Sequence, residues 1–184
     1  IKRYGPETIE QGVKDLGRAT RIIGHNIIGF DIPALQKLYQ FKPKEILDTL
    51  VCTRVIWPDL KRLDFDKKPK DLPVQNYGRH SLESWGLRIG ELKGDFGKTT
   101  DWSTYTPEML EYCVQDVQVT SALLELIESK KSSPICLELE HKFAEVMFLQ
   151  EQRGFKFDKQ KARVLYGEIH KRKVELEKEL QDIF

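Results

Sequence analysis

Two acidic residues and a tyrosine are the side chains of this sequence whose types and spacing could perform chemistry. Tyr112 and Asp116 are four residues apart in a segment with helical periodicity, so both lie on one face of the predicted helix. Asp31 lies far upstream, after a short apolar run. Carboxylates bind hard divalent cations, and a phenol beside them can orient a water molecule for attack. A tyrosine and an acid at this spacing are more often just a half-exposed pair, so a second motif has to support this interpretation.

Helices are predicted to position these residues. The long helix has Pro107 in its first turn and continues to Ser129. A first helix is predicted over residues 5–17, followed by a buried strand over 21–24 and a turn. Asp31 opens the next helix, and a simple N-cap is an equally good interpretation of that position.

The segments between these elements carry weaker signals. A short helix is predicted over residues 48–56, with Asp48 as its N-cap, and another over 81–86, ended by Gly86. Residues 59–79 lack periodicity and carry mixed charges. They are predicted to form a solvated surface loop with a weakly basic rim.

A polar linker over residues 130–134 predicts a boundary between two domains, 1–133 and 134–184. The second domain is predicted to consist of two helices with apolar stripes. The stripe of the last helix, over 162–183, has no obvious partner upstream. Because the chain also begins at Ile1 rather than at a methionine, we expect it to be a piece of a longer protein.

Composition excludes several classes of protein. The 184 residues, of which 40% are hydrophobic and 32% charged, suffice for one domain with a sizeable core and part of a second. The net charge of +1 gives no global sign of nucleic-acid or membrane binding, so a DNA groove would have to be local. No apolar run approaches the roughly 18 residues of a membrane span. The three cysteines are predicted to be buried, reduced thiols in a cytosolic compartment.

Two short motifs and two longer segments carry a resemblance to a known family. His25-Asn26-x-x-x-Phe30-Asp31 resembles the second motif of the 3′-to-5′ exonucleases that use four acidic residues and a tyrosine, and Tyr112-x-x-x-Asp116 resembles the third. The segments 78–94 and 140–158 resemble the family A DNA polymerases of short-tailed bacteriophages. The resemblance spans nearly the whole chain, and its parts occur in the order of such a polymerase.

The resemblance implies an α/β fold. A ribonuclease H-like exonuclease domain, lacking its first strands in this chain and therefore mostly helical, would be followed by the first helices of a polymerase domain. It also implies a two-metal site for Mg²⁺ or Mn²⁺. Asp116 would bind the ion that activates water, Asp31 would help to hold the second ion, and Tyr112 would orient the attacking water. Asn26 and Phe30 would position the terminal nucleotide.

The sequence departs from the family pattern at one motif. The Asp-x-Glu that supplies the other two carboxylates does not occur in these 184 residues. We expect it before Ile1, and we expect this chain alone to bind Mn²⁺ weakly and to degrade single-stranded DNA negligibly.

Three functions remain open on this basis. The first is the proofreading 3′-to-5′ exonuclease portion of a DNA-directed DNA polymerase, acting on a single-stranded or frayed 3′ end of DNA. Its expected setting is the cytoplasm of a phage-infected bacterium, with a processivity factor or a helicase as candidate partners. The second is a noncatalytic exonuclease-like scaffold that guides DNA to an attached polymerase. The third is a stand-alone RNA-trimming exonuclease of the same superfamily.

Overall fold

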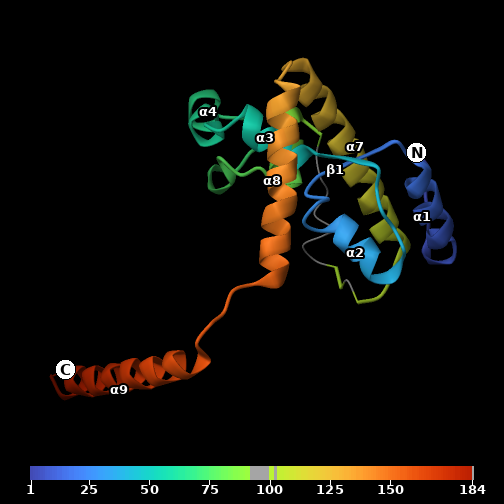
Figure 1. Cartoon of the computed structure of the whole chain (residues 1–184). Helices are drawn as coiled ribbons and strands as arrows, with labels where there is room; N and C mark the ends of the chain where they lie inside the picture. Colours follow the sequence, from blue (N-terminus) through green and yellow to red (C-terminus); the bar gives the residue numbers. More distant parts are fainter. Residues whose placement is uncertain (92–99, 102, 184) are drawn as a thin grey trace. The chain divides into compact units, whose positions relative to one another are not determined.

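The computed structural model describes residues 1–91, 100–101 and 103–183 (Figure 1). The chain divides into two compact units, Ile1–Leu149 and Gln150–Phe184, and each is described by itself. The predicted domain boundary at residues 133 and 134 falls inside the first unit. The two units are defined by their compactness, which does not show where one domain family ends and another begins. The boundary therefore stays a prediction.

The described residues are mostly helical, with one small parallel sheet, as predicted for an α/β fragment. Strands β1 (Arg21–Gly24) and β2 (Glu45–Asp48) pair in parallel, with Gly24 opposite Asp48. The crossover that a parallel pair requires contains a helix. The helices are η1 (Pro6–Thr8), α1 (Ile9–Arg18), α2 (Asp31–Leu38), α3 (Thr49–Ile56), α4 (Leu60–Lys67), η2 (Val74–Asn76), α5 (Leu82–Ile89), α7 (Pro107–Ser129), α8 (Pro134–Arg153) and α9 (Lys159–Ile183).

Several predicted boundaries are confirmed because they rest on local capping chemistry. Pro107 occupies the first position of α7, and the helix ends at Ser129. The Asp48 carboxylate accepts a hydrogen bond from the Leu50 N–H at the start of α3, as an N-cap does. β2 was not predicted, because its four residues run directly into that helix.

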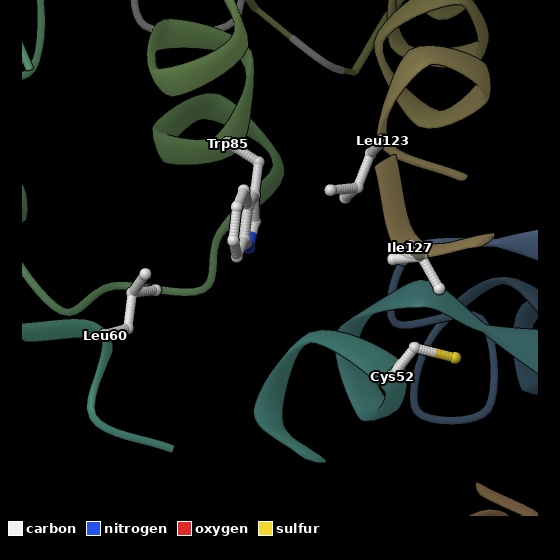
Figure 2. Close-up of a cluster of buried hydrophobic side chains, with 5 residues drawn as sticks. All are labelled: Cys52, Leu60, Trp85, Leu123 and Ile127. Atoms are coloured by element: carbon white, nitrogen blue, oxygen red, sulfur yellow. The ribbon is translucent and has the colours of Figure 1, made fainter. Parts of the chain in front are cut away.

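Two hydrophobic clusters form the core of the first unit. One surrounds the sheet and contains Val13, Ile27, Ile32 and Phe41. The other joins α3, α4, α5 and α7. Figure 2 shows its members, with the Trp85 side chain directed toward the space between α5 and α7. They are Cys52, Leu60, Trp85, Leu123 and Ile127.

The predicted end of α5 at Gly86 is wrong, and the reason is packing. The helix continues to Ile89 and ends at Gly90, which has a left-handed φ of 80°. Gly86 lies mid-helix, where a Cβ would come within 2.6 Å of the Glu91 carbonyl oxygen and 3.3 Å of Val119 on α7. A glycine is therefore needed there for close approach, at a cost in helix propensity.

The prediction of a solvated loop over residues 59–79 is also wrong. This segment contains α4 and η2, and it buries Leu60, Leu72 and the carboxylate of Asp64. Two further predictions fail on burial. Cys52 is buried as expected, whereas Cys113 and Cys136 are exposed.

Asp64 is held by an arginine from α5. Arg88 donates to its two carboxylate oxygens at 2.9 and 2.7 Å, and the Gly78 N–H donates at 2.8 Å. The same guanidinium donates to the Arg79 carbonyl at 2.8 Å and lies 5.0 Å from the Trp85 ring centre. Burial by itself would raise the pKa of Asp64, but these hydrogen bonds hold it below its usual value. One side chain thus fixes the segment between α4 and α5.

The start of α8 is joined to the end of β2 by a histidine. The Asp48 N–H donates to His141 Nε2 at 2.8 Å, so this nitrogen is unprotonated. The proton is therefore on Nδ1, which donates to the Leu137 carbonyl at 2.7 Å, one turn back in α8. Leu137 packs against the cluster around Trp85.

The second unit contains the last residues of α8, a connecting segment and α9. Gly154 follows α8 with a φ of 66°, and residues 154–158 belong to no helix or strand. No described residue of α9 is buried, and its apolar stripe, which includes Leu165, Ile169 and Leu180, is exposed. None of the described helices is long and apolar enough to cross a membrane.

Substitution of Arg88 by methionine tests the Asp64 contact. The variant keeps much of the apolar stem but leaves a buried carboxylate without its counterion, so the free energy of unfolding should fall by about 3–5 kcal/mol in urea denaturation. Arg62→Met, which removes an exposed arginine paired with Asp59 and Asp66, is the control and should cost less than about 1 kcal/mol. Equal effects would contradict the role given to Arg88.

Substitution of His141 by alanine tests the link between α8 and β2. It leaves the Asp48 N–H without its acceptor, so the free energy of unfolding should fall by about 1–3 kcal/mol. The neighbouring exposed Glu140→Ala should change it by no more than about 0.5 kcal/mol. Thermal unfolding of the three proteins measures the difference, and an unaffected His141→Ala protein would show that this hydrogen bond is not stabilising.

Candidate functional site

The candidate site lies at the carboxyl ends of the two parallel strands. Gly24 and Asp48 end β1 and β2 side by side, so the turn after β1 lies beside the Asp48 side chain. Parallel strands place the residues that follow them at one edge of a sheet, where ligands of α/β proteins commonly bind. Asp31 is the first residue of α2, immediately after this turn.

The Asp48 carboxylate holds the turn in place. It accepts hydrogen bonds from the N–H groups of Asn26 at 2.7 Å and Ile28 at 3.1 Å, in addition to that of Leu50 at 2.9 Å. Asp48 is 2% exposed, so these three donors take the place of water around its charge. Asn26 has a left-handed φ of 61°, which asparagine tolerates better than most residues. The left-handed backbone conformation is thus a sufficient reason for an asparagine at position 26, whether or not its side chain also binds a ligand.

A second contact fixes the residue before Asn26. The Thr49 hydroxyl donates to the Gly24 carbonyl at 3.2 Å, and it therefore accepts from His25 Nδ1 at 2.9 Å. A Cβ at Gly24 would lie 2.1 Å from Ile27, so a glycine is required where the turn folds back over the strand. The geometry of the turn is set by the protein itself.

Asp31 and Asp116 line one cleft, although they are distant in the sequence. The cleft has a volume of about 540 Å³ and lies between the turn, α3, the start of α5 and α7. A second hollow of about 560 Å³ runs along β1, α2 and α7, and both acids line it too. The residues around the first cleft are His25, Asn26, Phe30, Asp31, Leu50, Arg54, His80, Ser81, Leu82 and Asp116.

The acids of the cleft influence one another. Partial burial raises the pKa of Asp31, and the nearby carboxylates of Asp48 and Asp116 raise it further. Its own backbone N–H at the start of α2 acts in the opposite direction without cancelling the effect. Asp31 nevertheless keeps a solvent-exposed surface. A cation placed between Asp31 and Asp116 would relieve this repulsion.

Four of the five sequence-predicted site residues come together in the cleft. Asn26, Phe30, Asp31 and Asp116 all line it, and the Phe30 ring is 68% exposed. Tyr112 lies one turn before Asp116 on α7 and is half-buried, but it is not among the described residues that line the cleft. The predicted roles of the five residues stay predictions.

The described residues do not complete a metal site. No group of three or more His, Cys, Asp or Glu side chains among them is arranged to hold an ion. Asp48, the third acid near Asp31, is already bound to three N–H groups. The two remaining carboxylates suit a hard divalent cation, but they are too few to enclose one.

Sequence reasoning missed three polar residues of the cleft wall, Arg54, His80 and Ser81, and the apolar Leu50 and Leu82. Arg54 lies one turn after Leu50 on α3, and His80 and Ser81 precede α5. Burial lowers the pKa of His80 to about 4, and the positive charges of Arg54 and Arg88 contribute. The spacing of Leu50 and Arg54 could have indicated a shared face of α3, but nothing local shows that this face meets the turn.

No protein-family model matches the chain, but the chain is similar in sequence to known proteins. The chain is 32% identical to the DNA-directed DNA polymerase of Escherichia phage T7 over 213 aligned positions, which cover 92% of the chain and 30% of that polymerase. It is also 32% identical to the DNA-directed DNA polymerase of Enterobacteria phage T3, over 97% of the chain and 31% of that protein.

The alignments are longer than the chain itself, so they include gaps opposite segments that this chain lacks. The chain spans about 30% of the length of the curated relatives it matches. Similarity over nearly the whole chain at this level agrees with the resemblance seen in the polymerase-like segments. By sequence, this chain is therefore related to the DNA-directed DNA polymerases of these phages and matches a part of such a protein.

Proposed function

We propose that this chain is the proofreading 3′-to-5′ exonuclease portion of a DNA-directed DNA polymerase, with a ribonuclease H-like fold, followed by the first helices of the polymerase region. The observation that carries the proposal is the meeting of Asp31 and Asp116 in one cleft, beside Asn26 and Phe30. The relatives, which are DNA-directed DNA polymerases, support DNA rather than RNA as the substrate.

Divalent cations fit the chemistry of this cleft. Asp31 and Asp116 would hold Mg²⁺ or Mn²⁺, together with the two further carboxylates that the family resemblance implies. The bound ions would lower the pKa of a bound water molecule and would neutralise negative charge on the phosphate. The feature of the structure that favours a cation there is the raised pKa of Asp31, which is caused by burial and by the nearby carboxylates of Asp48 and Asp116.

The chain's own residues would bind and orient the terminal nucleotide. The exposed Phe30 ring can stack on an unpaired base, and stacking does not depend on base identity. Asn26 is held at the cleft by Asp48 and can offer its amide to the sugar or the phosphate. Tyr112 would orient the water from its position one turn before Asp116, which requires its phenol to reach the cleft in the complex with DNA.

One observation favours a second function. Among the described residues, the carboxylates that line the cleft are those of Asp31 and Asp116, and the sequence contains no Asp-x-Glu. A noncatalytic scaffold that guides single-stranded DNA to a polymerase would need no more than this. For either function, we predict that the protein acts in the cytoplasm of an infected bacterium. A processivity factor or a helicase is the predicted partner.

Substitution of Asp116 by asparagine tests the metal site. It should weaken Mn²⁺ binding, measured from the electron paramagnetic resonance signal of free Mn²⁺, by roughly tenfold or more, because one of the two carboxylates that line the cleft is lost. Asp59→Asn, an exposed acid outside the cleft, makes the same charge change and should have little effect. Equal effects of the two substitutions would favour the noncatalytic scaffold.

A 5′-labelled single strand tests the catalytic expectation. With Mn²⁺, this chain should shorten the strand from its 3′ end negligibly, because the reaction is expected to need four carboxylates. Rapid shortening that disappears in Asp116→Asn would show that two suffice.

Substitution of Asp31 by asparagine should stabilise the metal-free protein. The pKa of Asp31 is raised on folding, so its contribution to stability is fully present below the unfolded pKa and is lost as pH rises through the folded pKa. At neutral pH the ionised carboxylate therefore costs stability, which the neutral amide avoids. We expect a higher unfolding temperature for Asp31→Asn in EDTA, and a smaller increase on adding Mn²⁺ than in the unsubstituted chain. A lower unfolding temperature in EDTA would contradict this account of Asp31.

A further inference from the structure

Helix α3 presents one face to the core and another to the cleft. Thr49, Cys52 and Thr53 are fully buried, and Asp48 caps the helix from the end of β2. These contacts fix the rotation of the helix about its axis. Leu50 and Arg54, four residues apart, consequently share the face that lines the cleft.

Arg54 supplies the fixed positive charge of this cleft. It is the single lysine or arginine among the described residues that line it, and Asp31 and Asp116 line the same cleft. The side chain is exposed, and no described carboxylate lies within ion-pair distance of it. Its guanidinium donors are thus not used by the described part of the protein.

The neighbouring imidazole does not duplicate this charge. His80 lines the same cleft, and its Nδ1 is buried without a hydrogen-bond partner among the described residues. Its pKa is lowered to about 4, first by burial and then by the charge of Arg54, which places the two side chains near each other. His80 is therefore neutral at physiological pH, and Arg54 carries the positive charge of this wall.

We propose that Arg54 binds the phosphodiester backbone of the single strand that enters the cleft. A guanidinium offers paired donors that match phosphate oxygens, and it remains charged at all relevant pH values. A strand approaching Asp31 and Asp116 meets like charge, and a net charge of +1 provides little attraction from the rest of the chain. Arg54, in the lining of the same cleft, offsets that repulsion. This inference rests on the proposed function, since it assumes that the cleft receives a nucleic-acid strand.

A phosphate contact has a signature that a structural contact lacks. Each phosphate neutralised by a cationic side chain releases counterions, so the logarithm of the binding constant falls with the logarithm of salt concentration, with a slope of about −0.7 per contact for single strands. Loss of one contact should lower this slope and weaken binding equally for every base sequence.

The experiment measures binding of fluorescein-labelled oligodeoxythymidylate and oligodeoxyadenylate to the full chain by anisotropy, over a series of NaCl concentrations in EDTA. Arg54→Gln should weaken both by about tenfold at low salt and reduce the salt slope by about 0.7. Arg54→Lys should keep most of the slope, because the charge is retained. Arg62→Gln, which neutralises an exposed arginine of α4 outside the cleft, is the matched control and should leave the slope unchanged.

Two results would overturn the inference. One is a salt slope in Arg54→Gln equal to that of Arg62→Gln, and the other is an absence of oligonucleotide binding by the unsubstituted chain. The metal site is assessed separately, by Mn²⁺ binding to Asp116→Asn. An altered slope in Arg54→Gln with unchanged Mn²⁺ binding in Asp116→Asn would support the phosphate contact and reject the metal site, whereas the converse would reject Arg54 alone.

Discussion

The buried carboxylate of Asp48 is the interaction on which the site depends. It binds three N–H groups, two from the turn after β1 and one from the first turn of α3, while its own N–H is bound by His141 of α8. A charged acceptor at 2% exposure is tolerated because every donor is in place, and loss of any one would leave a buried charge less well solvated. Strand, turn and two helices therefore meet at one residue.

This arrangement separates the acid that shapes the site from the acids that can bind a ligand. Asp48 accepts hydrogen bonds from three backbone N–H groups, whereas Asp31 and Asp116 line the cleft. Burial and the nearby carboxylates of Asp48 and Asp116 raise the pKa of Asp31, so its ionised form is disfavoured. Such strain is common where a protein must receive a cation or a charged substrate. Arg54 lines the same cleft, so acidic and basic side chains both contribute to its surface.

The helices around the cleft are held by contacts that local sequence conceals. Gly86 brings α5 close to α7, and Arg88 ties α5 to α4 through Asp64. Together these contacts position the start of α5, where His80 and Ser81 line the cleft. One wall of the site is therefore supported by residues 59–79. The hydrophobic periodicity of this segment does not distinguish it from a solvated loop.

The sequence by itself determined the elements whose ends depend on near neighbours. The Asp48 cap of α3 and Pro107 at the start of α7 act within one helical turn, so their residue types are sufficient evidence. The tertiary structure alone decided that Asp48 reaches the turn after β1, that Gly86 is a contact rather than a helix end, and that Arg54 lines one cleft with Asp31 and Asp116. These outcomes depend on parallel pairing and helix packing between residues far apart in the chain, and no local pattern encodes such distances.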